Sequence, residues 1–176
     1  MDMKKTILVY GLLTGSIIIG SMLWGIMAAD SGGFSVWLGY LIMIVAMTMT
    51  FVGIKRYRDI QLGGVIKFSQ AFLLGLGITL VASLIYVLVW EIYLAMTHYA
   101  FMDHYTVGII ERAQNDGMAG AELQALQAKM AKMKTDYANV FFRLPMTFSE
   151  IFPVGLLVSL LSATILRLSN FLPARR

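Results

Sequence analysis

Four long apolar runs limit what this chain can fold into more than any other feature of its sequence. They cover about residues 6–29, 34–54, 71–97 and 146–168. An α-helix rises about 1.5 Å per residue, so roughly 20 apolar residues cross the hydrocarbon core of a bilayer. Each run is long enough, and the sequence therefore predicts an all-α polytopic membrane protein with four transmembrane helices.

The composition supports this prediction. Hydrophobic residues make up 59% of the chain and charged residues 14%, and a soluble domain needs more polar residues to cover its surface. The first three runs contain one charged residue, Glu91. The first run is about twice as long as the apolar region of a cleaved signal peptide, which has roughly 7–15 residues. We therefore expect it to be the uncleaved first span of a single membrane domain over residues 1–176.

The distribution of lysine and arginine predicts the orientation, because short cytoplasmic loops of membrane proteins are rich in these residues. Three segments are basic: Lys4 and Lys5; Lys55, Arg56, Arg58 and Lys67; Arg167, Arg175 and Arg176. The first loop contains only Asp30, and the loop after the third run has equal numbers of basic and acidic residues. Four spans with both termini in the cytoplasm fit this alternation.

The loop between the third and fourth runs, residues 98–143, is predicted to be an extracytoplasmic helical hairpin. Its second half has apolar residues at alternating spacings of four and three, as in a heptad seam: Ala119, Leu123, Leu126, Met130, Met133, Tyr137 and Val140. Residues 98–113 also have a helical pattern, with Phe101, Tyr105 and Ile109 on one side. Asn115–Gly117 is a break signal between the two. The alternative is that the second arm lies flat among the headgroups.

Five polar residues near the outer ends of the third and fourth runs form the candidate polar site: Glu91, His98, Asp103, His104 and Glu150. A carboxylate with imidazoles can bind zinc or relay protons, but no metal-ligand spacing such as HExxH is present. We therefore assign no catalytic and no metal-binding residue, and expect interfacial, capping or paired side chains. Glu91 should lie at the outer boundary with a polar neighbour, either a group at the start of the fourth span or a tyrosine hydroxyl. Thr147 and Glu150 have the spacing of a capping box, which predicts that the fourth helix starts there, after a break at Pro145.

The basic loop after the second run contains the candidate contacts to lipid headgroups or to a partner: Lys55, Arg56, Arg58 and Lys67. Each basic residue near an anionic surface contributes about 1 kcal/mol. Gly63 and Gly64 suit a tight turn in this loop.

Small residues mark the helix surfaces that we expect to pack closely. Gly11, Gly15, Gly25 and Ala29 share one face of the first run, and Gly75 belongs to a similar stripe on the third. We interpret these stripes as packing within the chain. A homodimer seam is the alternative.

Two segments carry a family resemblance. The stretch KRYRDIQLGGVIKFSQAFLLG, from Lys55 to Gly75, and the shorter EIFPVGL, from Glu150 to Leu156, resemble an uncharacterised bacterial family of small four-span inner-membrane proteins, a domain of unknown function. The resemblance implies a bacterial inner-membrane location and a four-span topology. It implies no reaction and no ligand.

Two classes of function follow. The first is a non-enzymatic inner-membrane accessory or interaction protein, with membrane lipids and a possible homodimer or membrane protein as partners. The second is a small dimeric transporter or lipid-handling protein with a polar path near Glu91 and Glu150. The chain has no cysteine, which excludes thiolate catalysis and cysteine-bound metals. We expect no cofactor and no nucleic acid partner, because the positive charges lie beside the spans.

Overall fold

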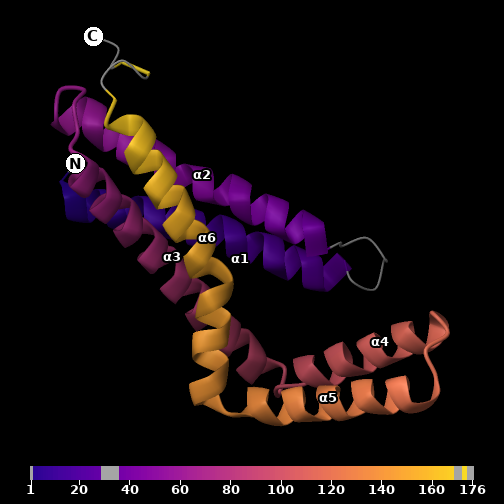
Figure 1. Cartoon of the computed structure of the whole chain (residues 1–176). Coiled ribbons are helices and arrows are strands. Elements are labelled where there is room, and N and C mark those ends of the chain that lie inside the picture. Colours follow the sequence, from indigo (N-terminus) through magenta and orange to yellow (C-terminus); the bar gives the residue numbers. More distant parts are fainter. Residues whose placement is uncertain (1, 29–35, 169–171, 174–176) are drawn as a thin grey trace. The chain divides into compact units, whose positions relative to one another are not determined.

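The protein is all α-helical in the part of the chain that its computed structural model describes, which is residues 2–28, 36–168 and 172–173. The helices within these residues are α1 (Met3–Ala28), α2 (Val36–Gln61), α3 (Phe68–Met96), α4 (Phe101–Asn115), α5 (Gly120–Ala138) and α6 (Val140–Leu166) (Figure 1). The predicted all-α class is therefore confirmed. Several residues of the sequence analysis lie outside the described residues: Ala29, Asp30, Arg175 and Arg176.

Four of these helices are long and apolar enough to cross a membrane. They are Met3–Ile26, Trp37–Gln61, Phe68–Met96 and Val140–Leu166. The prediction of a multi-pass membrane protein with four candidate spans is confirmed in this sense, by length and composition. Two boundaries differ from the expected ones by six or more residues: the second helix continues past residue 54 to Gln61, and the fourth begins before residue 146, at Val140. The other boundaries agree to within about three residues.

The described helices group into two compact units by their packing. The first unit consists of residues 1–87 and 148–176, and the second of residues 88–147. Helices α3 and α6 therefore contribute to both units. The expectation of a single membrane domain over the whole chain stays a prediction, and each unit is described by itself.

The first unit packs its helices closely through glycines. A Cβ on Gly11 of α1 would lie 2.6 Å from the Cβ of Val81 on α3, and one on Gly75 of α3 would lie 2.9 Å from Ser159 on α6. Neither position leaves room for a side chain, because real Cβ atoms do not approach other atoms so closely. Both glycines thus make contacts within the chain, and Gly15 and Gly25 are buried on α1 as well.

Two clusters of buried side chains form the core of this unit. The first consists of Tyr10, Ile54, Ile66, Ala71, Leu74, Ile78, Ala163 and Leu166. The second consists of Ile18, Met43, Ala46, Met47, Tyr86 and Ile151. Between α2 and α3, Gly63 and Gly64 adopt φ of 65° and 96°, which confirms the expected tight turn at this pair.

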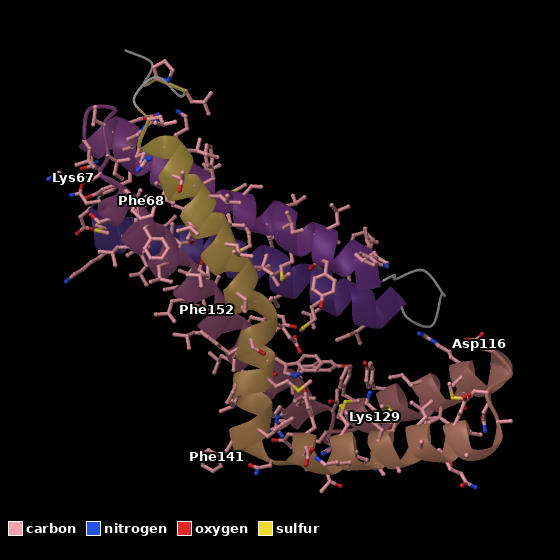
Figure 2. All side chains as sticks on the ribbon, in the orientation of Figure 1. Lys67, Phe68, Asp116, Lys129, Phe141 and Phe152 are labelled. Atoms are coloured by element: carbon pink, nitrogen blue, oxygen red, sulfur yellow. The ribbon has the colours of Figure 1, made fainter. Side chains whose placement is uncertain are left out.

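The second unit contains the α4–α5 hairpin. The two helices contact each other and are joined by a short connection, with Asp116 at its tip (Figures 1 and 2). The heptad prediction holds for α5, where Met130 and Tyr137 are buried and Leu123, Leu126 and Met133 are half-buried. Gly117 and Gly120 have positive φ at the connection, and α5 starts at Gly120, one residue after the first residue of the predicted seam, Ala119.

The inner face of α4 differs from the expected one by a single position. Met102 and Thr106 are its buried residues, while Tyr105 is 46% exposed. Phe101 and Tyr105 stack on each other at a ring separation of 5.8 Å. The face of Phe101, Tyr105 and Ile109 was expected from the helical spacing of these large apolar residues, whereas the helix buries Met102 and Thr106.

Asn139 sets the start of α6. Its backbone is extended, and its side-chain Oδ1 accepts a hydrogen bond of 3.0 Å from the N–H of Phe141, the geometry of an N-cap. The expected capping box at Thr147 is therefore wrong, because Thr147 lies inside the helix and is buried. Pro145 does not break the helix either: it removes one backbone donor, and the helix continues on both sides.

Candidate functional site

An ion pair joins the end of α3 to the beginning of α6 in the second unit. Arg143 donates from Nε to Oε1 of Glu91 and from Nη2 to Oε2, both at 2.7 Å. Two parallel hydrogen bonds between a guanidinium and a carboxylate form the strongest type of side-chain pair, because both partners are charged and the geometry is fixed. Glu91 thus has its polar neighbour in the first turn of the fourth long helix.

Arg143 also contacts a backbone carbonyl oxygen and two aromatic rings. Its Nη1 donates to the backbone oxygen of Tyr137 at 2.9 Å. The guanidinium carbon also lies 5.1 Å from the ring centre of Tyr99 and 5.7 Å from that of Tyr137. The side chain is 4% exposed. Because a carboxylate, a carbonyl oxygen and two aromatic rings fix the guanidinium in place, we interpret Arg143 as a residue that stabilises the structure.

This ion pair borders a cavity of about 640 Å³ within the second unit. The residues that line it are Glu91, Leu94, His98, Tyr99, Met102, Asp103, Lys134, Tyr137, Ala138, Val140 and Arg143. Three residues of the candidate polar site, Glu91, His98 and Asp103, therefore share one cavity. His104 is not among the lining residues and is exposed on α4. Glu150 belongs to the other unit.

The turn between α3 and α4 presents two of these residues in a strained backbone conformation. His98 has φ of 50° and Tyr99 has φ of 58°, in the left-handed region where a non-glycine residue costs about 1–3 kcal/mol. The N–H of Tyr99 donates to the oxygen of Leu94 at 2.8 Å and that of His98 to Ala95 at 3.3 Å, which is the Schellman pattern of a helix end. The cation–π contact of Tyr99 with Arg143 offsets part of this cost.

Two further contacts hold the hairpin to the end of α3. Trp90 donates from Nε1 to the hydroxyl of Tyr137 at 2.6 Å, and its ring packs edge-on against Phe101 at 4.8 Å. Asp103 pairs with Lys134 across the hairpin, and both side chains are more than half exposed. Trp90 itself is only 6% exposed, so it is a core residue of this unit.

The first unit contains the second polar site, around Glu150. The hydroxyl of Tyr86 donates to Oε2 of Glu150 at 3.2 Å. A cavity of about 300 Å³ adjoins this pair, lined by Ile18, Ser21, Met22, Gly39, Tyr40, Met43, Tyr86, Glu150 and Ile151. Glu150 thus faces residues of α1, α2 and α3 in its own unit.

Arg58 differs from the expectation that it contacts lipid headgroups. Its side chain is fully buried, and its guanidinium donates to Asp59 at 2.7 Å and to the backbone oxygens of Leu166 and Leu172 at 3.4 and 2.5 Å. Its charge meets the negative end of the α6 dipole, where a cation stabilises the helix. Arg58 is therefore a cap for the C-terminal end of α6.

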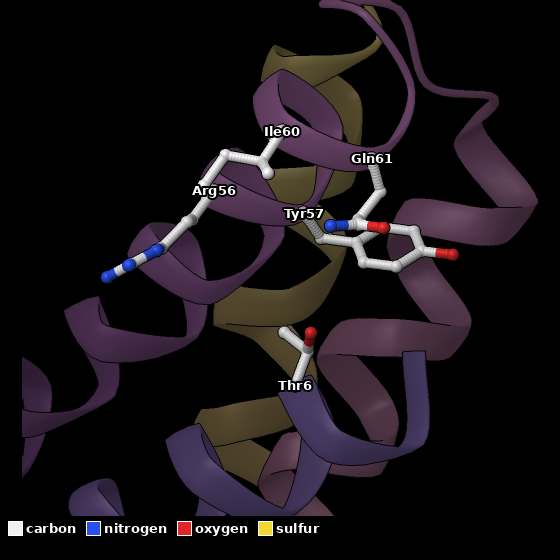
Figure 3. Close-up of a pocket in the computed structure, with 5 residues that line it drawn as sticks. All are labelled: Thr6, Arg56, Tyr57, Ile60 and Gln61. Atoms are coloured by element: carbon white, nitrogen blue, oxygen red, sulfur yellow. The ribbon is translucent and has the colours of Figure 1, made fainter. Parts of the chain in front are cut away.

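The other cations of the basic loop are more accessible. Arg56 and Lys67 are exposed, while Lys55 forms a bond of 2.5 Å to Asp59. Arg56 also borders a small cavity of about 190 Å³, together with Thr6, Tyr57, Ile60 and Gln61. Figure 3 shows the Arg56 guanidinium directed away from Tyr57 and Gln61. Arg56 and Lys67 thus have the exposure that a headgroup contact requires.

Sequence reasoning missed Arg143, Tyr137 and Lys134 as members of the larger site. One signal was available for Arg143, because a charged residue beside a membrane span usually pairs with another polar or charged group. Its partner Glu91 is 52 residues away, so only the folding of the hairpin brings the two together. Among the described residues, no three His, Asp or Glu side chains gather as metal ligands would.

Comparison with known protein families gives a match over most of the chain. The chain matches the family of proteins of unknown function DUF4199 over residues 9–167, which is most of its length. No curated protein and no solved structure matches it significantly. The match includes α1 from residue 9 onward, the other three long helices and the hairpin with its ion pair. This chain therefore belongs to the DUF4199 family, whose function is unknown.

Proposed function

We propose that this protein is a non-enzymatic accessory or interaction protein of the bacterial inner membrane. In this proposal both termini are cytoplasmic, the α4–α5 hairpin stands outside the membrane, and the exposed basic residues Arg56 and Lys67 contact lipid headgroups. The alternation of basic and non-basic segments supports the orientation. A membrane protein or a second copy of the chain is the partner, and no nucleic acid or cofactor takes part.

The bidentate pair between Glu91 and Arg143 is the observation that carries this proposal. A carboxylate that moves protons or cations must exchange its partner during each cycle. Glu91 instead has both oxygens bound to a guanidinium that is 4% exposed and has further contacts. Its geometry suits a fixed contact within the second unit, between the end of α3 and the start of α6, which is what a rigid interaction module needs.

The absence of paired catalytic groups in the described residues also favours a non-enzymatic role. Neither histidine side chain has a hydrogen bond to a hydroxyl or a carboxylate there. A general base that activates a nucleophile must lie within hydrogen-bond distance of it.

Photo-cross-linking in intact cells tests the interaction role. A photoreactive amino acid is placed at Tyr105 or Val107, which are 46% and 52% exposed on α4, and at Leu84, which is 55% exposed on α3. We expect discrete protein adducts from the two hairpin positions that are lost when Met130 is replaced by Asp. Identical adduct patterns at all three positions, or none from the hairpin, would contradict the proposal.

A transporter or lipid-handling protein is the second candidate, and the Glu150 cavity favours it. Glu150 has no cationic partner among the described residues, unlike Glu91. Reconstituted vesicles distinguish the two functions. Flux of protons or an organic cation that is lost in Glu150→Gln would favour transport, whereas no flux above empty vesicles supports the accessory role.

A further inference from the structure

The cavity beside Glu150 is built by four helices of the first unit. Ser21 and Met22 come from α1, Tyr40 and Met43 from α2, and Tyr86 from α3, while Glu150 belongs to α6. Four of its lining residues also belong to the second buried cluster: Ile18, Met43, Tyr86 and Ile151. The cavity is thus a preformed hollow on a packed core.

The carboxyl group in this cavity has no charged partner among the lining residues. Glu150 is the one ionisable acid or base apart from tyrosine among its lining residues. In the described part of the chain its carboxylate has no ion pair, and its hydrogen bond from Tyr86, at 3.2 Å, is long. This contrasts with Glu91, whose two oxygens are both bound to Arg143. A carboxylate in a membrane helix usually has a cationic partner, and the described residues do not provide one here.

The other lining groups suit the body of an organic cation. Tyr40 and Tyr86 provide aromatic rings, which attract ammonium groups through their faces. Met22 and Met43 provide flexible, polarisable thioethers that adapt to an apolar ligand. Tyr40 is 53% exposed and Glu150 is accessible as well, so the carboxylate can be reached from outside the helix bundle.

A bare metal ion fits this cavity less well than an organic cation. Hard cations require about six oxygen ligands, whereas this cavity offers one carboxylate and a few hydroxyls. The Ser21 hydroxyl already donates to the oxygen of Ile18 at 2.7 Å. A hollow of about 300 Å³ holds about ten groups the size of a water molecule, at ~30 Å³ each.

We propose that the Glu150 cavity binds a small organic cation, a substituted ammonium with an apolar body of about ten non-hydrogen atoms. The Glu150 carboxylate pairs with the positive charge, Tyr40 and Tyr86 lie against it, and Met22, Met43 and Ile151 contact the apolar part. This site is independent of the hairpin and of the proposed interaction role, so either can fail without the other.

Binding of benzyltrimethylammonium to the full-length protein in lipid nanodiscs tests the proposal, with neopentylbenzene as the neutral molecule of the same shape. Titration calorimetry and saturation-transfer NMR should detect the cation only. Glu150→Gln should weaken binding by about tenfold or more, the factor expected when a charge-assisted contact is lost. Glu111→Gln makes the same chemical change at an exposed residue of α4 and should leave the affinity unchanged.

Two further measurements keep the test decisive. If Glu150→Gln does not fold, Tyr40→Leu at the exposed mouth should still weaken binding several-fold, since it removes one ring and keeps apolar volume. A hydrophobic carbodiimide that modifies Glu150 should be excluded by the cation. Equal binding of the neutral molecule, full affinity in both variants, or carbodiimide labelling that the cation does not reduce would each overturn the proposal. The last outcome would mean that Glu150 takes up only a proton.

Discussion

At the scale of single residues, three charged side chains of the spans have three different environments. Arg143 forms an ion pair with Glu91, donates a hydrogen bond to the backbone oxygen of Tyr137 and lies over the ring of Tyr99. Arg58 binds the C-terminal end of α6. Glu150 has one long hydrogen bond and an adjacent cavity. Burial and partners, not the type of residue, therefore separate structural charges from a candidate binding group.

Replacing Arg143 by Gln should strongly destabilise the second unit. The change leaves Glu91 without its partner, and removal of one member of a buried ion pair costs about 3–5 kcal/mol. Because Glu91 is 23% exposed, we expect a value near the lower end. Unfolding of the purified protein in detergent, followed by thermal denaturation and amide exchange of α4 and α5, measures it.

The exposed pair between Lys134 and Asp103 provides the control. Lys134→Gln removes a contact whose partners are 56% and 54% exposed, so the loss should be about 0–1 kcal/mol. For the inner pair, Glu91→Gln alone should also destabilise the second unit. The double variant that exchanges the two charges, Glu91→Arg with Arg143→Glu, should recover part of the stability lost in Glu91→Gln. Equal effects of Arg143→Gln and Lys134→Gln would contradict a structural role for the inner pair.

At the scale of elements, capping and periodicity decide where the helices begin and how they pack. Asn139 ends α5, where its backbone N–H donates to the oxygen of Asp136, and its side chain accepts from the N–H of Phe141 at the start of α6. The heptad spacing of α5 brings Met130 and Tyr137 to one side of the helix, where both are buried within the second unit. The hairpin therefore depends on a few positions that can be tested singly.

Asn139→Ala should destabilise the start of α6 by about 0.5–2 kcal/mol, because the N–H of Phe141 loses its acceptor. Asn139→Asp keeps an acceptor oxygen at the same place and should behave like the wild type. Amide exchange of Phe141 and Phe142 reports the difference. Unchanged exchange in the alanine variant would show that the cap contributes nothing.

Met130→Asp should unfold the hairpin while the four long helices stay inserted, since it buries a charge in the seam. Gln127→Asp places the same charge on an exposed position of α5 and should have little effect. Limited proteolysis between residues 101 and 138 compares the two. Wild-type resistance of Met130→Asp would mean that the seam does not hold α5 to α4.

At the scale of the whole molecule, the orientation in the membrane is the main expectation that awaits measurement. The four candidate spans follow from length and composition, whereas the cytoplasmic position of the termini follows from the basic segments. The orientation also fixes which side the Glu150 cavity faces. Glu150 lies about 24 Å from the C-terminal end of α6 at 1.5 Å per residue, near the outer boundary if the termini are inside.

Labelling of single introduced cysteines in intact cells decides the orientation, because the chain has no cysteine of its own. Position 127 of α5 should react with an impermeant reagent, and position 56 should react only after the membrane is permeabilised. Both positions are exposed, so access to the reagent depends on the membrane alone. The reverse pattern would overturn the proposed topology.

Local patterns in the sequence were sufficient to predict the four long helices, the hairpin and its heptad seam, because each depends on residues close together in the chain. They were not sufficient for the start of α6, where Pro145 and the Thr147–Glu150 spacing suggested a later boundary than the Asn139 cap. Only the tertiary structure pairs Glu91 with Arg143, buries Arg58 against Leu166, and surrounds Glu150 with residues of α1, α2 and α3. These contacts join residues far apart in the chain. Their energy depends on how helices approach one another, and no local periodicity specifies that approach.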